Sequence, residues 1–161
     1  MLDAGCGPGE PTGVALRDAG LHVIPLDRSA GQLALARRHH ERCVRGDLCA
    51  LALADVSVDA VVALYSCTHL PPDSQPGAIA EFARVTKPGG RLVVTLSASP
   101  VEHGDHDRWL GVDTYFGGLA PDANRAALEG AGWHITDDEI IMLAEPEVAT
   151  QFHWLAAYRR H

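Results

Sequence analysis

The sequence predicts an α/β fold built on a mostly parallel sheet, and three observations support this. Apolar segments with the length of strands alternate with helical segments along the 161 residues, which is typical of strands joined by crossover helices. The segment Asp59–Ser66 is an almost unbroken apolar run, as expected for a strand covered on both faces. A glycine-rich loop follows the first strand and an acid follows each of the next two, at the sheet edge where ligands bind.

The chain opens on a strand that ends in a glycine loop, Gly5-Cys6-Gly7-Pro8-Gly9, just after Asp3. Glycine lets a buried strand turn sharply and lets a ligand lie against bare backbone. The G-x-G-x-x-G order of dinucleotide-binding loops is not met, because Glu10 stands at the third glycine position. An acid there would point toward a pyrophosphate, which argues against NAD or FAD. An ordinary strand-to-helix turn is the simpler alternative.

The segment Leu2–Gly9 resembles the first motif of the S-adenosylmethionine-dependent methyltransferases with a Rossmann-like fold. The resemblance implies that the backbone of Gly5, Cys6 and Gly7 faces the methionine part of the cofactor, and that Asp3 helps to order its amino end. It implies S-adenosyl-L-methionine as cofactor and S-adenosyl-L-homocysteine as product. It also implies a three-layer sandwich with a mostly parallel seven-stranded sheet, whose last strand is antiparallel.

Length and composition indicate a single domain over residues 1–161, with no room for a second one. The chain is 47% hydrophobic and 21% charged, and no apolar run is long enough to span a bilayer. No signal peptide precedes the first strand, which indicates a cytoplasmic protein without a membrane partner. The net charge of -8 argues against a nucleic-acid partner, since phosphate binding needs clustered basic residues. A small-molecule methyl acceptor is favoured.

The cysteines and histidines do not predict a metal site. The four cysteines show neither a C-x-x-C pair nor a zinc-ribbon spacing, so we expect reduced, mostly buried thiols. His39 and His40 stand at the end of a predicted helix, where a solvated turn is expected. Histidines and acids also gather within Ser97–Asp113, where a metal site is conceivable. A solvated lid is the preferred interpretation of that long polar segment.

The second strand, His22–Asp27, follows a short helix over Glu10–Ala19 that Gly20 closes. Pro25 removes one donor from the strand, so we expect a local irregularity there. Asp27 ends the strand, where its carboxylate can accept hydrogen bonds from both hydroxyls of an unphosphorylated ribose. This is the second motif of the resemblance.

The third strand, Cys43–Arg45, follows a helix that Ser29 caps. The strand leads to Asp47 and Leu48. The resemblance implies that Asp47 binds the exocyclic amine of adenine, that Leu48 packs near the ring, and that Arg28 flanks its other side. A plain surface turn at Gly-Asp is the alternative, and acids after three successive strands make it the weaker one.

The turn after the fourth strand carries the candidate methyl-transfer residues. By the resemblance this turn lies beside the sulfonium, so Tyr65, Ser66 and His69 are expected to line the site. Alignment of the two reactants could suffice for the reaction, because the methyl group is already activated. A base is needed only for a hydroxyl or ammonium acceptor, and the His69 imidazole is the first candidate. The alternative is that His69 only hydrogen-bonds the turn.

The second half of the sequence predicts the remaining helices and strands of the fold. Lys87–Arg91 resembles the family's turn before the fifth strand, and the resemblance runs to about Arg160. The predicted elements are a helix over Gln75–Thr86, a strand over Leu92–Leu96, a helix over Pro121–Ala131, and strands over Trp133–Leu143 and Thr150–Tyr158.

The helices that usually precede the first strand in this family are absent here, since the first strand starts at Met1 or Leu2. We therefore expect the natural gene product to begin upstream, or a partner subunit to cover the exposed faces of the sheet. An exposed apolar patch would also favour a homodimer.

Two functions other than methyl transfer stay open. A catalytically degenerate adenosyl-cofactor-binding or interaction protein would bind S-adenosylhomocysteine without methylating an acceptor. An NAD-dependent oxidoreductase is permitted by Asp27 and disfavoured by Glu10, and it leaves the Lys87–Gly90 turn unexplained. Fold and cofactor motif do not fix the methyl acceptor or its reacting atom.

Overall fold

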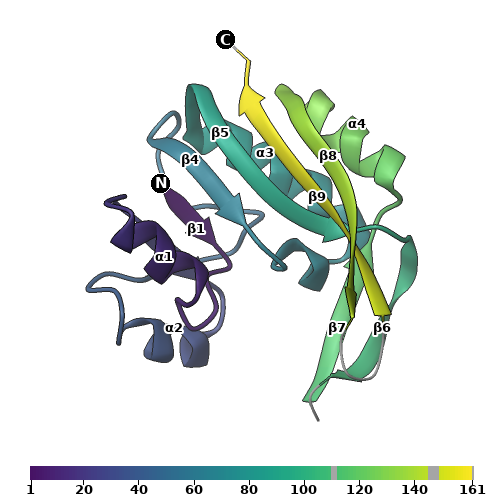
Figure 1. Cartoon of the computed structure of the whole chain (residues 1–161), viewed down its shortest axis with the longest axis horizontal. Helices are drawn as coiled ribbons and strands as arrows, with labels where there is room; N and C mark the ends of the chain where they lie inside the picture. The colour runs from purple at the N-terminus through teal and green to yellow at the C-terminus, as the bar shows by residue number, and fades with distance from the viewer. Residues whose placement is uncertain (110–111, 145–148, 161) are drawn as a thin grey trace.

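A mixed sheet of seven strands organises the chain (Figure 1). This computed structural model describes residues 1–109, 112–144 and 149–160. The strand order is β3-β2-β1-β4-β5-β9-β8; the first five strands are parallel, and β9 is antiparallel to both β5 and β8. The predicted fold class is thereby confirmed. The strands are β1 (Leu2–Ala4), β2 (Ile24–Asp27), β3 (Val44–Arg45), β4 (Val58–Ala63), β5 (Thr86–Ser97), β8 (Trp133–Ala144) and β9 (Ala149–Arg159), with β6 (Val101–Trp109) and β7 (Val112–Gly118) paired separately.

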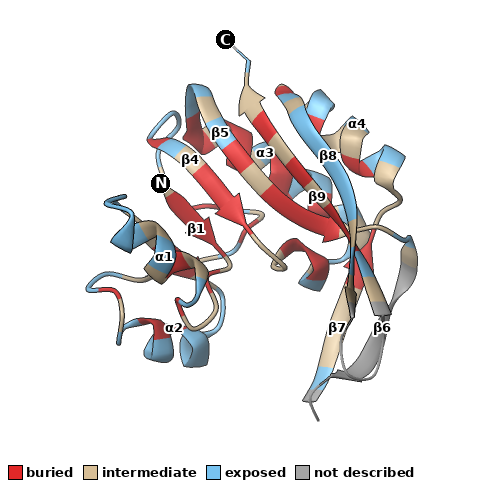
Figure 2. Cartoon of the chain, viewed as in Figure 1, coloured by how far each residue is buried: buried red, intermediate tan, exposed pale blue. Residues whose placement is uncertain are grey.

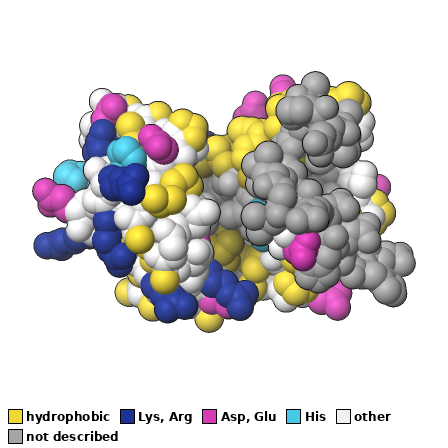
Figure 3. All heavy atoms as spheres, turned by 90° about the horizontal axis from the view of Figure 1, so that it is seen from below, with side chains coloured by type: hydrophobic (Ala, Val, Ile, Leu, Met, Phe, Trp, Pro, Cys, Tyr) yellow, Lys and Arg dark blue, Asp and Glu magenta, His cyan; other side chains and the backbone are white. Residues whose placement is uncertain are grey.

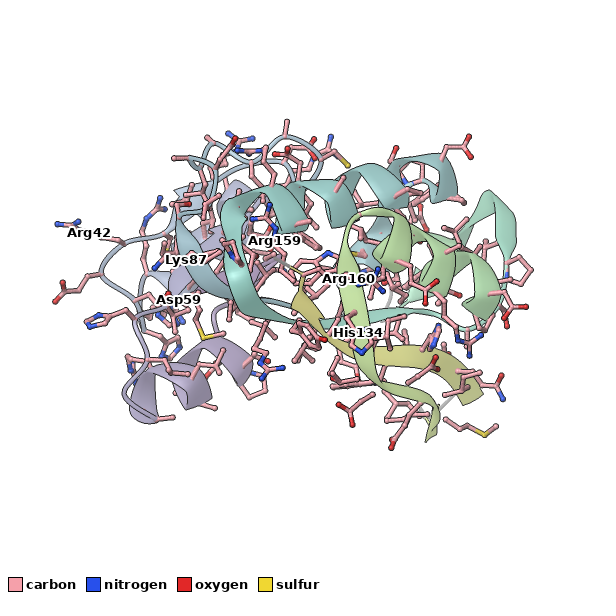
Figure 4. The ribbon with its side chains drawn as sticks, turned by 90° about the horizontal axis from the view of Figure 1, so that it is seen from above. Arg42, Asp59, Lys87, His134, Arg159 and Arg160 are labelled. Carbon is pink, nitrogen blue, oxygen red and sulfur yellow. The ribbon has the colours of Figure 1, made fainter. Side chains whose placement is uncertain are left out.

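Helices lie on both faces of the sheet. Figures 1 and 4 place α1 on one face and α3 and α4 on the other. Ser29 caps α2 as predicted, because its Oγ accepts a hydrogen bond from Gln32 N at 3.3 Å. None of the helices in the described ranges is long and apolar enough to span a bilayer. The helices are α1 (Thr12–Asp18), α2 (Ala30–Ala36), α3 (Gln75–Val85) and α4 (Pro121–Gly130), with short 3-10 turns η1 (Cys67–His69) and η2 (Pro72–Ser74) before α3.

The main core lies between the sheet and the helices α3 and α4. Figure 2 shows β1 and much of β4 buried, in keeping with the unbroken apolar run of the sequence. Leu92 of β5 and Phe82 of α3 are completely buried in the same cluster. Trp133 at the start of β8 is also completely buried, and its indole N–H donates to Ile79 O at 3.4 Å. These contacts hold α3 against the sheet.

One face of β5, β9 and β8 has no helix over it within the described ranges (Figures 1 and 2). On β8, Ile140 is 50% exposed and Met142 is 61% exposed. The expectation of helices on both faces is therefore met for the sheet as a whole, whereas this part of it is covered on one face only. The contacts of α2 with β2 and β3 lie at the opposite edge of the sheet.

The irregularity expected at Pro25 is absent, since β2 pairs with β1 in continuous register through Pro25 itself. Ile24 N donates to Met1 O, so the nitrogen of the next residue faces away from β1. On that other side, β3 pairs only with Leu26 and Asp27. No strand pairs with Pro25 on the side that its nitrogen faces, so the missing N–H costs no hydrogen bond of the sheet.

The turn expected over Lys87–Arg91 is a bulge inside β5. The register with β4 jumps from Val58 opposite Thr86 to Ala60 opposite Arg91. Gly89 adopts a φ of 75° in the bulge, a conformation that glycine reaches without strain. Lys87 Nζ bonds the Asp59 carboxylate at 2.6 Å, so the bulge is tied back to β4.

The solvated lid expected over Ser97–Asp113 is wrong for the backbone, because β6 and β7 form an antiparallel hairpin. The polar sequence of β6 hid this strand, since its pattern lacks the apolar alternation of a half-buried strand. The side chains of residues 102–112 lie outside the described part of the structure, and so do residues 110 and 111 altogether. The histidine and acid cluster considered as a metal site falls mostly there.

We expect Leu92→Ala to lower the free energy of unfolding by about 2 to 5 kcal/mol, because it leaves a cavity in a fully buried cluster. Ile140→Ala on the exposed face of β8 is the matched control and should change it by less than about 0.5 kcal/mol. Urea denaturation of both variants measures this. Equal losses would contradict the assignment of the core to the α3 and α4 side.

Candidate functional site

A cleft of about 320 Å³ opens at the carboxyl ends of the central parallel strands. This is where strand order reverses direction, with β2 on one side of β1 and β4 on the other. The lining comes from the segments that follow β1, β2, β3 and β4. It comprises Gly5, Gly7, Asp27, Arg28, Gln32, Asp47, Leu48, Tyr65, Ser66, His69 and Leu70. All the predicted site residues except Asp3 and Cys6 are in this set.

The glycine loop passes very close to the turn after β4. A Cβ atom on Gly5 would lie 2.2 Å from Ser66 Cβ, and Gly5 has a φ of 80°. Ser66 Oγ donates to Ala4 O at 2.7 Å, while the N–H groups of Gly5 and Cys6 both donate to Leu26 O. The loop is therefore held between β2 and β4, and a larger residue at position 5 cannot be accommodated.

Asp27 shapes the glycine loop as well as lining the cleft. Its Oδ2 accepts from Gly7 N at 2.9 Å, and its Oδ1 accepts from Ser29 N at 2.7 Å. A carboxylate has about four lone-pair positions, so each oxygen can still accept a hydroxyl hydrogen from a ligand. Gly7 has a φ of 54°, and the space beside it is open, with no atom within 4 Å of a built Cβ. A ligand can thus approach the backbone of the loop directly.

Asp3 lies beneath the loop, outside the lining. It is 4% exposed, and its Oδ2 has no hydrogen-bond partner among the described residues. Burial, and then the nearby charge of Asp27, raise the pKa of the Asp3 carboxyl to about 6. An unpartnered buried carboxylate is a site of negative potential, so it favours a cation placed over the loop.

Cys6 belongs to the glycine loop but lies outside the lining of the cleft. The thiol is buried against Leu33 and Ala36 of α2. Burial, followed by the charges of Asp3 and Asp27, raises the pKa of the thiol to about 12. Cys6 is therefore a packing residue and an unreactive thiol.

Asp47, Leu48 and Arg28 all belong to the lining of the cleft. Asp47 Oδ1 accepts from Cys49 N at 2.9 Å, which turns the chain after β3. Leu48 is buried, whereas Arg28 is exposed and its carbonyl accepts from Arg45 Nε at 3.1 Å. The lining thus includes an acid, an apolar side chain and a planar guanidinium from the segments that follow β2 and β3.

Tyr65, two residues beyond the end of β4, has a left-handed conformation with a φ of 56°. Such a backbone is uncommon for a bulky residue and occurs mostly where surrounding contacts fix it. The ring stacks edge to face on Phe152 at 4.8 Å and on Trp154 at 5.9 Å between centroids. Both partners belong to β9, which is distant from the glycine loop along the chain. Their aromatic character was the one sequence signal for this contact, and it does not indicate which strand the rings pack against.

His69 is held by the β6–β7 hairpin. Its Nδ1 lies 3.0 Å from Tyr115 O; a carbonyl only accepts, so Nδ1 carries the hydrogen and Nε2 keeps its lone pair. The completely buried Gln75 donates from Nε2 to Leu70 O at 3.2 Å and to Gly117 O at 3.1 Å. The hairpin, the η1 turn and α3 are thereby joined next to the cleft. No sequence pattern indicates the role of Gln75, since both of its acceptors are backbone carbonyls.

Two side chains near the loop differ from expectation. His40 is 8% exposed, not solvated, and its ring Nε2–H donates to Gly9 O at 3.1 Å. Glu10 lies outside the lining, with its carboxylate 3.6 Å from His39 Nε2. The argument that Glu10 would repel a pyrophosphate is therefore wrong in its geometry. The negative charge that would repel a pyrophosphate comes instead from Asp27 and Asp47 in the lining and from Asp3 beneath the loop.

Metal ligation has no candidate within the described residues, where no group of three or more His, Cys, Asp or Glu side chains could hold an ion. Cys6 and Cys67 are buried, and Cys43 and Cys49 are half-buried. The chemistry of the cleft is thus that of carboxylates, glycine backbone, one guanidinium and one imidazole.

The family model described as "Methyltransferase domain" matches residues 2–94 of the chain. A demethylmenaquinone methyltransferase from Renibacterium salmoninarum is 38% identical over 102 residues, covering 62% of this chain and 42% of that protein. A malonyl-[acyl-carrier protein] O-methyltransferase from Pectobacterium atrosepticum is 43% identical over 103 residues, covering 61% and 38%. The chain spans less than half the length of these curated relatives.

Solved structures share the fold. A SAM-dependent methyltransferase from Methanosarcina mazei superposes with a TM-score of 0.87 at 18% identity, over 99% of this chain and 91% of that one. A 1,6-didemethyltoxoflavin-N1-methyltransferase from Burkholderia thailandensis, solved with S-adenosylhomocysteine bound, gives a TM-score of 0.73 at 19% identity, over 99% and 70%. At these identities the likeness concerns the fold alone.

The pKa of Asp3 predicts a stability that depends on pH. The carboxyl pKa is about 6 in the folded chain and near 3.8 when unfolded, so the folded state holds the proton more tightly between these values. Stability therefore falls as pH rises from about 4 to 6 and stays lower above that range. We expect Asp3→Asn to be more stable than the parent protein at pH 7.5 by about 1 to 3 kcal/mol, with no gain near pH 3.5.

Urea denaturation at the two pH values measures the effect of Asp3→Asn. Asp73→Asn, on the exposed η2 turn, is the matched control and should show no such difference. A gain in stability that is the same at both pH values would contradict the assignment to the Asp3 carboxylate.

Proposed function

The chain belongs to the methyltransferase-domain family, and from this premise we propose that it binds S-adenosyl-L-methionine in the cleft and methylates a small organic acceptor. The observation that carries the proposal is the convergence of four strand ends on one cleft, with the glycine loop and the acids Asp27 and Asp47 in its lining. Because the chain spans less than half of its curated relatives, activity and acceptor are proposals for the whole protein.

The residues present fit this cofactor, which carries a positive sulfonium and a positive amino group. Asp3 offers a buried carboxylate whose Oδ2 has no partner in the described part of the chain, and Asp27 and Asp47 add negative charge in the lining. A pyrophosphate would be repelled by the same groups, which argues against the NAD-dependent alternative. Gly7 leaves the backbone of the loop open to a ligand.

Individual roles follow from the contacts of each residue. Asp27 would hold the ribose hydroxyls with the lone pairs that its two backbone partners leave free. Asp47 would accept the adenine amine, with Leu48 and Arg28 on the two faces of the ring. Asp3 would act through its charge, since it lies outside the lining.

The cofactor supplies a methyl group that the sulfonium already activates. The chain supplies alignment of the acceptor, which contributes about 7 to 11 kcal/mol in favourable cases. Tyr65 and Ser66 form the wall of the cleft after β4, and the aromatic contacts of Tyr65 with β9 hold that wall rigid.

His69 is proposed as the base for a hydroxyl or ammonium acceptor. Tyr115 O occupies Nδ1, so the lone pair on Nε2 is the one that can take a proton. Gln75 joins the two segments that carry Tyr115 and His69, and so fixes the ring. For an acceptor without an acidic hydrogen, alignment alone remains the role of this region.

The named relatives act on demethylmenaquinone and on malonyl-[acyl-carrier protein]. The two names share a small organic group, free in one case and carried on a protein in the other, so we propose a small organic acceptor and do not choose one acceptor atom. A cytoplasmic location, the absence of a nucleic-acid partner and a homodimer stay predictions from the sequence.

We expect calorimetric titration to show binding of S-adenosylmethionine and S-adenosylhomocysteine, and none of NAD. Gly7→Ala should weaken S-adenosylhomocysteine binding by about tenfold or more, because a methyl group enters the open space over the loop. Gly20→Ala is the matched control: Gly20 also has a positive φ and an open Cβ position, but lies outside the cleft. Both substitutions place alanine at a positive φ and should lower the stability of the fold, but Gly20→Ala should leave S-adenosylhomocysteine binding unchanged.

No adenosyl binding by the folded chain, or equal effects of the two glycine variants, would overturn the cofactor assignment. Binding of S-adenosylhomocysteine with no transfer to any tested small acceptor would favour the non-catalytic alternative.

For a hydroxyl or ammonium acceptor, we expect His69→Gln to lower kcat by about 10²- to 10⁴-fold and to leave S-adenosylhomocysteine affinity unchanged. Glutamine keeps a donor for Tyr115 O and removes the basic nitrogen. His134→Gln, on the exposed part of β8 (Figure 4), is the matched control and should leave both quantities unchanged. An unaltered kcat in His69→Gln would contradict the assignment of His69 as the base and leave it only its structural contact with Tyr115 O.

A further inference from the structure

A chain of hydrogen bonds joins α4 to the sheet near the ends of β5 and β9. Asn124 of α4 and His153 of β9 are both completely buried. Asn124 Nδ2 donates to Ser97 O at 2.8 Å and lies 3.2 Å from His153 Nδ1. His153 Nε2 lies 2.9 Å from Asp138 Oδ1, and Arg125 donates to the same carboxylate from Nε at 2.5 Å and from Nη2 at 3.2 Å. We call this set the Asn124 network; it consists of Ser97, Asn124, Arg125, Asp138 and His153.

The direction of each bond in the Asn124 network is determined. The amide nitrogen of Asn124 has two hydrogens, and Ser97 O accepts one of them. The other is donated to His153 Nδ1, so the ring hydrogen is on Nε2 and is donated to Asp138. The hydrogen bond from Arg125, and after it the one from His153, lower the pKa of the Asp138 carboxyl to about 2 against the opposite effect of burial. The His153 ring is thus fixed in one tautomer and one orientation.

The residues on either side of His153 support the cleft. Successive side chains of a strand point to opposite faces of the sheet. His153 points toward α4, so Phe152 and Trp154 lie on the other face, where both rings contact Tyr65. Figure 3 views the molecule from the side toward which β4 and β5 run, and hydrophobic side chains reach the surface near the middle of that view. The network therefore holds the segment of β9 that carries the aromatic support of Tyr65.

A second contact joins the network to the β6–β7 hairpin. Ser97 is the last residue of β5 and pairs with Phe152 of β9. A Cβ atom on Gly118, at the end of β7, would lie 2.3 Å from Ser97 Cβ. The same strand β7 provides Tyr115 O, the hydrogen-bond partner of His69. The network thus lies against both segments that contact the cleft residues after β4.

Packing alone does not account for these polar groups. Asn124 Oδ1 is buried and has no hydrogen-bond partner among the described residues. A buried polar atom without a partner lowers stability, whereas an apolar side chain of the same shape would fill the space without that loss. Buried polar side chains impose an orientation that apolar packing does not, because hydrogen bonds are directional. The network is therefore suited to fixing a position.

We propose that Asn124 and His153 are positioning residues of the cleft. Their hydrogen bonds hold Phe152 and Trp154 where Tyr65 packs on them, and so set the wall of the cleft against which an adenosyl ligand binds. The proposal rests on the proposed function, because it takes this ligand as the occupant of the cleft. Its first consequence, the position of the Tyr65 ring, is measured without any ligand.

The test follows the Tyr65 ring by fluorine NMR of the chain labelled with 3-fluorotyrosine, with Tyr65→Phe to assign the resonance. Calorimetric titration with S-adenosylhomocysteine measures affinity. We expect Asn124→Leu and His153→Phe to shift or split the Tyr65 resonance and to weaken binding by about 3- to 30-fold. His153→Phe keeps a ring but neither hydrogen bond. Asp138→Ala, at a side chain 30% exposed, removes the acceptor of His153 and should shift the resonance even if Asn124→Leu does not fold.

Two further variants separate positioning from stability. His153→Gln keeps an acceptor for Asn124 and a donor for Asp138 without the ring, so its resonance and affinity should match those of the parent chain within about twofold. Thr86→Val is the matched control: it removes a completely buried hydroxyl that donates to Phe82 O at 2.7 Å, at the start of β5. It should leave the Tyr65 resonance and the affinity unchanged, whatever stability it loses in urea.

An unchanged Tyr65 resonance or an unchanged affinity in the folded network variants would overturn the proposal. Equal losses in His153→Gln and His153→Phe, or the same changes in Thr86→Val, would also overturn it. Absence of S-adenosylhomocysteine binding in the parent chain would instead refute the cofactor assignment, and the Tyr65 resonance alone would then decide whether the network positions this ring.

Discussion

The close approach of the glycine loop to the turn after β4 is the contact on which the site depends. No side chain fits at Gly5, because its Cβ would overlap Ser66. That overlap is avoided only by glycine, and the Ser66 hydroxyl then bonds the backbone of β1. The contact sets the distance between the carboxyl ends of β1 and β4, and hence the width of the cleft. The three residues of β1 could not fix this geometry by strand pairing alone.

The site stores electrostatic energy for its ligand. Oδ2 of the buried Asp3 has no hydrogen-bond partner among the described residues, and burial raises the pKa of the carboxyl because it disfavours the charged form. A cation bound over the loop would stabilise the Asp3 carboxylate. The buried carboxylate would therefore lower the stability of the cofactor-free fold and raise its affinity for a positively charged cofactor. Asp27 combines two functions in the same way, since the carboxylate that would bind ribose also positions Gly7.

The net charge of -8 is reflected in the cleft, whose lining holds two carboxylates, Asp27 and Asp47, and one guanidinium, Arg28. The β6–β7 hairpin contacts the same site through the hydrogen bond between His69 and Tyr115 O. A cofactor near the acids and an acceptor near His69 would thus share one cleft.

The sequence by itself determined the sheet, its glycine loop and the acids at the strand ends, because each depends on local patterns of a few residues. Asp27 ends β2, and Asp47 and Tyr65 each stand two residues beyond a strand, so parallel topology alone brings them to one edge. Only the tertiary structure decided which distant segments meet there. In the tertiary structure His40 is buried against the loop, and aromatic rings of β9 pack against Tyr65. His69 contacts a hairpin whose polar sequence did not indicate strands. Those contacts join residues far apart in the chain, often through backbone carbonyls, which no side-chain pattern records.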